Sequence, residues 1–271
     1  MLPHNPDIIS KLRKEILGLQ GYKLSYDKPE GIPNLGPMNA AFPNQKFPLT
    51  TIHEFVSSGP ESFSASSSFI AALLSTIMPA NGLVVWASPY QNIFPPGLKC
   101  FNIEPDRIIF LHAQKEKDRL WLIEEALKCE GLSAVVGEIS PLNFTSSRRF
   151  QLAIERSRVT GIIINSNRTY PLPARRSGGG TGGYKPNTPS DRVIRAGINN
   201  TSGVRWRITS LPSNTRLPGI GFPKWNVELL KVKNGKVGTW RVTWNGFTFD
   251  VSHLTAQSRP ALPGTPFIKS A

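Results

Sequence analysis

The sequence is poor in cysteine and has no long apolar run. Its two cysteines, Cys100 and Cys129, are too few for a disulfide framework, and neither belongs to a CxxC pair. The longest apolar run, FIAALLSTIM, ends before Pro79 and is shorter than a membrane span. The first residues, MLPHNPDIISKLRKEILGLQ, have no apolar core of the signal-peptide kind. We therefore expect a cytoplasmic protein without membrane contact.

Metal-ligand and hydrolase patterns are absent as well. The four histidines, His4, His53, His112 and His253, are far apart in the sequence, with no metal spacing and no Ser/His/Asp context. We expect neither a metal site nor a hydrolytic triad.

Acidic residues are scarce in the second half of the chain. The net charge is +14, yet residues 1–143 carry 12 Lys/Arg and 14 Asp/Glu, whereas residues 144–216 carry 13 and 2, and residues 217–271 carry 7 and 2. The excess in residues 144–216 is nearly all arginine, whose planar fork binds phosphate through two hydrogen bonds. This block favours a polyanionic partner such as DNA or RNA. A basic face that only aids solubility is the alternative.

From Leu49 onward, strand-like and helix-like patterns alternate. Strand-like runs cover residues 51–56, 82–88, 107–113, 132–139 and 160–165, and helical patterns cover residues 64–78, 116–129 and 145–158. Strands joined by helices of this length imply right-handed crossovers. The sequence therefore predicts an α/β fold with a mostly parallel sheet flanked by helices.

The last strands carry hairpin signals. Strand-like runs at residues 225–233, 238–244 and 247–251 are separated by Asn-Gly pairs at 234–235 and 245–246, the strongest short signal for a tight turn. Together with residues 204–210, they predict an antiparallel β meander over 204–251 that extends the sheet.

The flanking segments differ in composition from this domain. Residues 1–20 have the apolar spacing of an amphipathic helix, and residues 21–48 are rich in Pro, Gly and Asn, as in a linker. We expect one domain over 49–251, with a mobile basic loop at 168–203, and a disordered tail at 252–271. The helix and the tail are either docking segments for partner proteins or caps on the domain.

The segment SSGPESFSASSSF, residues 57–69, stands where a phosphate-binding loop would stand, between a strand and a helix. In the working pattern, GxxxxGK[ST], the lysine contacts the outer phosphates and the hydroxyl binds magnesium. In this sequence Ser64 occupies the position of the second glycine, and Ala65 occupies the position of the lysine. The degenerate loop comprises Gly59, Pro60, Glu61, Ser62, Ser64, Ala65, Ser66 and Ser67. Its backbone amides would bind an anion weakly; alternatively, Ser64 or Ser66 only caps the next helix.

Several stretches of the sequence resemble two known protein families. EFVSSGPES resembles the approach to the phosphate loop in the RecA recombinase family. DRLWLIEEALKCEGLSAVVGEI, LNFTSSRRFQLAIERSRVTGIII, RWRITSLPS and PKWNVELLKVKNGKVGTWRVTW closely resemble the ImuA family, RecA-related accessory proteins of bacterial error-prone repair operons that are often described as SulA-like. The resemblance implies a RecA-like core with a C-terminal antiparallel extension.

The RecA comparison also implies where catalytic groups would be. The water-activating acid falls near Ser88, the metal-orienting Asp falls at Gly137 with Glu138 one position on, and the polar sensor falls near Ser166. Lysine, acid and Asp are missing from their expected places, and such losses cost orders of magnitude in rate. We expect a pseudo-ATPase with no catalytic residues and no bound cofactor or metal.

The ImuA resemblance implies a non-catalytic accessory protein in DNA damage tolerance, that is, SOS-type mutagenesis and translesion synthesis. It would bridge DNA to ImuB, a Y-family-related polymerase homologue, and to an error-prone replicative-type polymerase subunit, with RecA or a second copy as a further contact. It would act in the cytoplasm, at the nucleoid. The alternatives are an ATPase with an atypical loop, using Arg148 or Lys115 in place of the lysine, and a SulA-like cell-division inhibitor.

The basic block supplies the candidate DNA contacts. In RecA-like proteins the loop after the strand at 160–165 touches single-stranded DNA, and Tyr170 or Tyr184 could stack on bases there. The predicted DNA-binding residues are Arg148, Arg149, Arg168, Arg175, Arg176, Lys185, Arg192 and Arg195.

Overall fold

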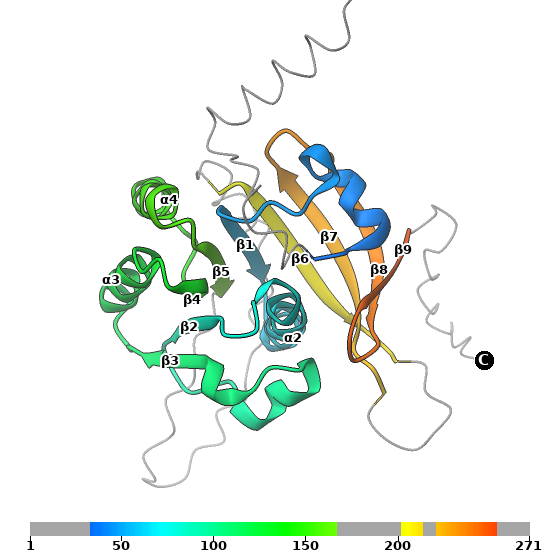
Figure 1. The fold of residues 1–271 in the computed structure, drawn as a ribbon, viewed down its shortest axis with the longest axis horizontal. Coiled ribbons are helices and arrows are strands. Elements are labelled where there is room, and N and C mark those ends of the chain that lie inside the picture. Colours follow the sequence, from blue (N-terminus) through cyan, green and yellow to red (C-terminus); the bar gives the residue numbers. More distant parts are fainter. Residues whose placement is uncertain (1–32, 167–201, 214–220, 254–271) are drawn as a thin grey trace, which may run out of the picture.

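The computed structural model describes residues 33–166, 202–213 and 221–253. Within these residues the chain forms one sheet of nine strands in the order β3-β2-β4-β5-β1-β6-β7-β8-β9 (Figure 1). The strands are β1 Ile52–Ser57, β2 Leu83–Ser88, β3 Ile108–His112, β4 Leu132–Ile139, β5 Thr160–Ser166, β6 Val204–Leu211, β7 Lys224–Val232, β8 Gly238–Trp244 and β9 Phe249–His253. The α-helices are α2 Pro60–Ile77, α3 Glu116–Leu127 and α4 Phe144–Ser157.

Helices cover both faces of the parallel part of the sheet. Figure 1 shows α3 and α4 side by side on the left, with α2 apart from them. The larger apolar cluster joins α2 to alternate strand residues such as Phe55, Trp86 and Trp206, and the smaller one joins α3 and α4 to residues such as Ile52 and Val135. Because strand side chains alternate between faces, one apolar run supplies both clusters.

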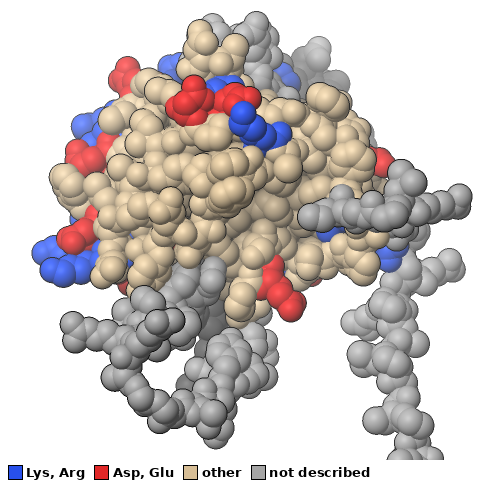
Figure 2. All heavy atoms as spheres, turned by 90° about the horizontal axis from the view of Figure 1, so that it is seen from below, with Lys and Arg blue, Asp and Glu red and all other residues tan. Residues whose placement is uncertain are grey.

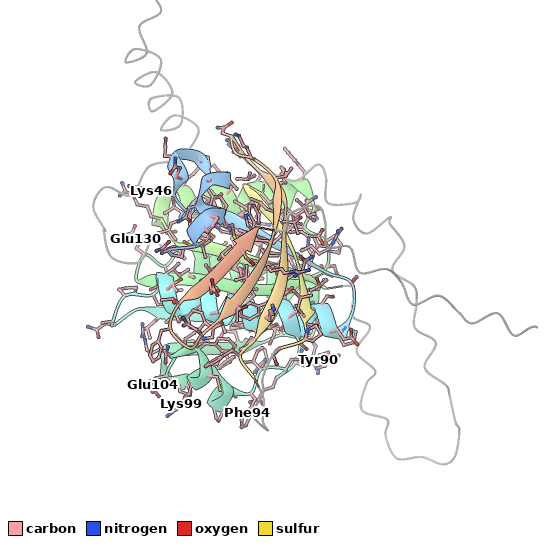
Figure 3. The ribbon with its side chains drawn as sticks, turned by 90° about the vertical axis from the view of Figure 1, so that its right-hand side faces the viewer. Lys46, Tyr90, Phe94, Lys99, Glu104 and Glu130 are labelled. Atoms are coloured by element: carbon pink, nitrogen blue, oxygen red, sulfur yellow. The ribbon has the colours of Figure 1, made fainter. Side chains whose placement is uncertain are left out.

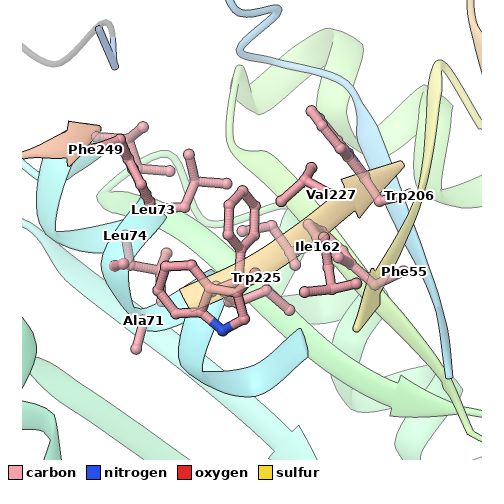
Figure 4. Close-up of a cluster of buried hydrophobic side chains, with 14 of the residues drawn as sticks. Phe55, Ala71, Leu73, Leu74, Ile162, Trp206, Trp225, Val227 and Phe249 are labelled. Atoms are coloured by element: carbon pink, nitrogen blue, oxygen red, sulfur yellow. The ribbon is translucent and has the colours of Figure 1, made fainter. Parts of the chain in front are cut away.

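The C-terminal strands extend this sheet. β6 pairs with β1 in parallel and with β7 antiparallel, and β7–β8 and β8–β9 are antiparallel pairs. One residue of each Asn-Gly pair takes positive φ, Asn234 (59°) in the connection between β7 and β8 and Gly246 (99°) in the connection between β8 and β9. This confirms the predicted fold class, a mostly parallel α/β sheet with an antiparallel extension. The cluster in Figure 4 shows Trp225 and Phe249 of the extension packed with Leu73 and Leu74 of α2.

The linker expected over 21–48 is wrong for its described part, residues 33–48. This stretch forms two short 3₁₀ helices, η1 Gly36–Ala41 and η2 Pro43–Gln45, and the side chains of Leu35, Met38 and Phe47 are at most 3% exposed. The stretch packs against β8 and β9, and Ala41 O accepts a hydrogen bond from Lys236 N at 2.8 Å. Pro and Gly prevent a regular period here, but the apolar residues between them still reach the core.

A buried histidine ties this stretch to the sheet. His53 of β1 is fully buried, and burial lowers its pKa to about 4, so the ring is neutral at neutral pH. Trp206 Nε1 can only donate, so it donates to His53 Nδ1 at 3.2 Å, and the other ring nitrogen, Nε2, donates to Pro48 O at 2.8 Å. The ring also stacks on Phe47, with centroids 4.5 Å apart.

The connection from β2 to β3 crosses the edge of the molecule. It contains η3 Pro95–Phe101 and η4 Pro105–Arg107. In Figure 3, Lys99 and Glu104, an ion pair of 3.1 Å, lie near Phe94, whose side chain is exposed.

No helix in the described ranges is long and apolar enough to cross a membrane. The expected helix at 1–20 and most of the expected tail at 252–271 lie outside the described residues.

Candidate functional site

The junction between β1 and α2 is the place of the predicted phosphate loop. β1 ends at Ser57 and α2 begins at Pro60, so only Ser58 and Gly59 separate them. The alternative in which Ser64 or Ser66 caps the next helix is wrong, because Gly59 is the N-cap. Proline at the first helical position, followed by Glu61, is a helix-start signal strong enough to shorten the loop.

Ser62 closes the beginning of α2. Its Oγ accepts hydrogen bonds from Ser58 N at 2.9 Å and Gly59 N at 3.1 Å, and donates to Gly59 O at 3.1 Å. In a phosphate loop, backbone amides of this kind point at the anion. Here a side-chain hydroxyl already satisfies two of them.

The remaining residues of the predicted loop are helical. Ser64 Oγ donates to Pro60 O at 2.9 Å, and Ser66 Oγ contacts Ser57 Oγ at 3.2 Å in a buried position. Ala65, at the position of the missing lysine, is 4% exposed and belongs to the larger apolar cluster. A lysine here would therefore point into the core. The helical hydrogen bonds also use the amides of Ser64 to Ser67.

The positions of the missing acids have structural roles of their own. Ser88 Oγ donates to Tyr90 O at 2.8 Å and lies 3.1 Å from His112 Nδ1. A Cβ at Gly137 would lie 2.3 Å from Ile123 Cδ1 of α3, so this position faces α3 and has no room for a side chain. Neither position offers a carboxylate.

Glu138 is the acid that the strand alternation places on the other face. Its neighbour in the same orientation, Val136, belongs to the cluster that contains α2, and Glu138 itself is 2% exposed. The resemblance to RecA had placed the acid one residue earlier in β4, at Gly137. The period of two in a strand, applied to AVVGEI, would have identified Glu138 instead.

Arg119 of α3 closes the carboxyl ends of two strands. This buried guanidinium donates to Glu138 O at 3.0 Å and to Ala113 O and Gln114 O, both at 2.7 Å. These carbonyls follow β3 or lie near the end of β4, where strand pairing ends. Arg119 therefore has a structural role at the edge where α/β proteins bind ligands.

The predicted DNA-binding residues are only partly described. Arg148 and Arg149 lie in the first half of α4 and are exposed; Arg149 forms an ion pair with Glu124 of α3, and Arg148 forms no ion pair within the described ranges. The other six predicted residues lie outside the described residues: Arg168, Arg175, Arg176, Lys185, Arg192 and Arg195.

Sequence reasoning missed a buried polar cluster around Glu54 of β1. This carboxylate is fully buried and accepts hydrogen bonds from Arg205 Nε at 2.8 Å, Arg205 Nη2 at 2.7 Å and Ser202 Oγ at 3.0 Å, and from Asn165 Nδ2. Burial, together with the positive charge of Arg205, lowers the pKa of nearby Lys231. Ionised groups are rarely buried unless they are paired, and this one is.

The Glu54 cluster joins residues that flank the basic segment. Asn165 lies one residue before the last described residue of β5, and Ser202 is the first described residue after the break. One carboxylate therefore binds the chain on both sides of residues 167–201. The signal in the sequence was Glu54 itself, an acid within the strand-like run TIHEFV. No group of three or more His, Cys, Asp or Glu that could hold a metal occurs among the described residues.

Comparison with known proteins adds a relationship to this geometry. No protein-family model matches the chain. Protein ImuA of Caulobacter vibrioides, in strains NA1000 / CB15N and ATCC 19089 / CIP 103742 / CB 15, is 31% identical over 208 residues, which cover 75% of this chain and 78% of that protein. Among solved structures, the crystal structure of SulA from Pseudomonas aeruginosa aligns with a TM-score of 0.37 and 19% identity, over 42% of this chain and 96% of that one.

Proposed function

The chain belongs to the ImuA family, and on that premise we propose that it is a non-catalytic accessory protein of error-prone DNA damage tolerance. The observation that carries the proposal is the 31% identity over 208 residues, which spans most of both chains. In this role it bridges DNA to an ImuB-like polymerase homologue and an error-prone replicative-type polymerase subunit during translesion synthesis. It acts in the cytoplasm, at the nucleoid.

The junction of β1 and α2 supports a role without catalysis. ATP hydrolysis needs a cation on the outer phosphates, and the position of that cation, Ala65, is in the core. Ser62 also satisfies the amides of Ser58 and Gly59, which a phosphate would need. Phosphate binding here would require α2 to lose its first turn.

The charge distribution supports a role at DNA. The excess of 13 Lys/Arg over 2 Asp/Glu in residues 144–216 gives this block a strong attraction for phosphates. Within it, Arg149 already forms an ion pair with Glu124, and the other predicted DNA contacts are Arg148 together with five arginines and one lysine of residues 168–195.

Binding to single-stranded DNA tests this assignment. Fluorescence anisotropy with a labelled oligonucleotide should show an affinity that falls as salt rises, with a linear slope of log K on log salt. Replacing Arg175, Arg176, Arg192 and Arg195 by Ala should weaken binding and flatten the slope. A control with four lysines replaced elsewhere should keep most of the affinity: Lys99, Lys115, Lys128 and Lys236. Equal losses in both variants would overturn the assignment to residues 168–195.

A cellular experiment tests the role itself. Deleting the gene should lower the frequency of mutations induced by ultraviolet light or a crosslinking agent, and the intact gene should restore it. The variant Ser62→Ala, which leaves the arginines unchanged, should also restore it. An unchanged mutation frequency in the deletion strain would overturn the proposed role.

The alternative is an ATPase with an atypical loop, and Glu138 is the observation that favours it, because its carboxylate lies on the α2 face of β4. Isothermal titration with ATP and magnesium separates the two functions. The accessory role predicts no magnesium-dependent binding, whereas tight magnesium-dependent binding that is lost in Glu138→Gln would favour the ATPase.

A further inference from the structure

The outer surface of α3 and α4 carries large apolar side chains that no described element covers. Trp121 of α3 is 57% exposed and Leu152 of α4 is 45% exposed. Tryptophan is usually well buried in a monomer, and exposed aromatic side chains are enriched at protein interfaces. In Figure 1 the two helices lie together at the left edge, with their outer sides away from the sheet.

An ion pair joins the two helices between these side chains. Arg149 of α4 binds Glu124 of α3. Trp121 precedes Glu124 by three residues, and Leu152 follows Arg149 by three, so each lies one turn away from its member of the pair on the same side of its helix. Because α3 and α4 both follow parallel strands, they run in the same direction, and the two apolar residues lie diagonally across the ion pair.

Basic residues continue this diagonal at both ends. Lys117 lies one turn before Trp121, and Arg156 lies one turn after Leu152. Both are exposed, and neither forms an ion pair within the ranges that the structure describes. We call Lys117, Trp121, Leu152 and Arg156, with the ion pair between them, the α3–α4 stripe. In Figure 2, acidic and basic side chains gather along the left edge, the side on which α3 and α4 lie in Figure 1.

We propose that the α3–α4 stripe is a docking surface for an acidic amphipathic segment of a protein partner. The order of the stripe is cation, apolar, ion pair, apolar, cation. Its complement is a segment with two apolar anchors and carboxylates at both ends. Tryptophan and arginine are the residues most often found at the energetic centre of protein interfaces. This inference does not depend on the DNA-damage role.

The chemistry of the stripe favours a protein over a nucleic acid. At its centre Glu124 is paired with Arg149 and Lys128, and Glu125 with Lys128. The cations of the stripe that form no ion pair within the described residues, Lys117 and Arg156, therefore lie at its two ends and do not form the continuous basic row that a phosphate backbone favours. Leu152 has no aromatic ring on which a base could stack and no hydrogen-bonding group for a phosphate. Both apolar residues instead fit the alternating anchors of a helix laid across two helices.

Selection from a peptide library tests the proposal without naming a partner. The full chain would be panned against displayed 16-residue random peptides, with Trp121→Ala/Leu152→Ala as the counter-selection. We expect enriched sequences with Asp or Glu on both sides of two large apolar residues at helical spacing. Basic peptides, or no enrichment over the counter-selected variant, would overturn the proposal.

Affinity measurements on one enriched peptide then locate the contacts. Trp121→Ala should weaken binding at least about tenfold, and Lys117→Ala or Arg156→Ala about threefold each. Lys117→Glu/Arg156→Glu should abolish binding of the acidic peptide and accept a peptide whose acids are replaced by lysine. The control Phe247→Ala removes a ring that is 77% exposed on the β8–β9 turn, and should leave affinity unchanged.

A parallel titration with a single-stranded oligonucleotide distinguishes the other anionic partner. Trp121→Ala should keep the DNA affinity and salt slope of the unmodified protein. If it instead lost DNA binding by the same factor as peptide binding, the stripe would be a nucleic-acid surface and the proposal would be wrong. Unchanged thermal melting of the variants would show that the losses come from the surface.

Discussion

Glu54 and Arg205 face each other directly across the parallel pair of β1 and β6, and their side chains form a buried ion pair of 2.7 Å. The pair joins the core to the C-terminal strands, since β1–β6 is the strand pairing through which the extension continues the sheet. The register of this pairing places Glu54, the only acid of β1, opposite Arg205 of β6. A shift of the register by one residue would separate the two side chains and leave each charge buried without its partner.

Removing one partner of this pair should be strongly destabilising. Arg205→Met leaves the Glu54 carboxylate buried without the guanidinium that pairs with it, and should lower the free energy of unfolding by about 3 kcal/mol or more. Glu54→Gln added to Arg205→Met removes the buried charge and should recover a large part of that loss. Urea unfolding measures both, and equal stabilities of the single and double variants would contradict the assignment.

His53 should make the protein less stable as the pH is lowered. Its folded pKa of about 4 lies below the ordinary 6.5, so between these values the unfolded chain binds a proton that the folded ring does not. The contribution of neutral His53 to the free energy of unfolding should therefore be fully present above pH 6.5. It should decrease by about 3 kcal/mol as the pH falls to about 4. His53→Gln keeps a donor and an acceptor but cannot titrate, and its urea midpoint should change less over this range.

Restoring an acid at Gly137 should damage the fold without creating activity. A Cβ at this position would lie 2.3 Å from Ile123 Cδ1, so Gly137→Ala should cost about 1–3 kcal/mol through overpacking, and Gly137→Asp more. Ile123→Val removes the colliding methyl and should reduce the cost of Gly137→Ala. Thermal unfolding checks the order of the variants. A phosphate-release assay on Gly137→Asp should stay at the background rate.

The start of α2 should depend on one hydroxyl. Ser62→Ala leaves the amides of Ser58 and Gly59 without their partner, and should cost about 1 kcal/mol. Ser64→Ala is the matched control, since its exposed Oγ only bonds back to Pro60 O within the helix, and it should change stability by less than about 0.5 kcal/mol. Equal effects in urea unfolding would show that the contacts of Ser62 are not special.

The sequence predicted those parts of the fold that depend on local periodicity. The apolar run GLVVWAS is β2, buried on both faces, and the two Asn-Gly pairs are the turns of the C-terminal hairpins. Residues 33–48 were missed because Leu35, Met38 and Phe47 enter the core from short 3₁₀ helices, which have no long period. Their burial depends on strands far along the chain, β8 and β9.

The candidate site was less predictable, because its residues meet only in the folded sheet. The contact of Glu54 with Ser202 and Arg205 joins residues about 150 positions apart, and no spacing in the sequence indicates it. The assignment of Gly137 rather than Glu138 came from aligning positions without asking which face of β4 each one takes. Ser62, by contrast, could have been identified from Pro60 and Glu61, which mark the start of a helix.

The contacts of Glu54 also fix the two ends of the segment between β5 and β6. Asn165 and Ser202 are bound by one buried carboxylate, so the sheet fixes where the polypeptide leaves and where it returns, whatever lies between. Exchanging residues 167–201 for the corresponding stretch of a relative leaves both of these anchoring residues in place, and we expect the Glu54 contacts to form in such a chimera. Such chimeras would let the chemistry of the interval be transplanted and compared on a constant framework.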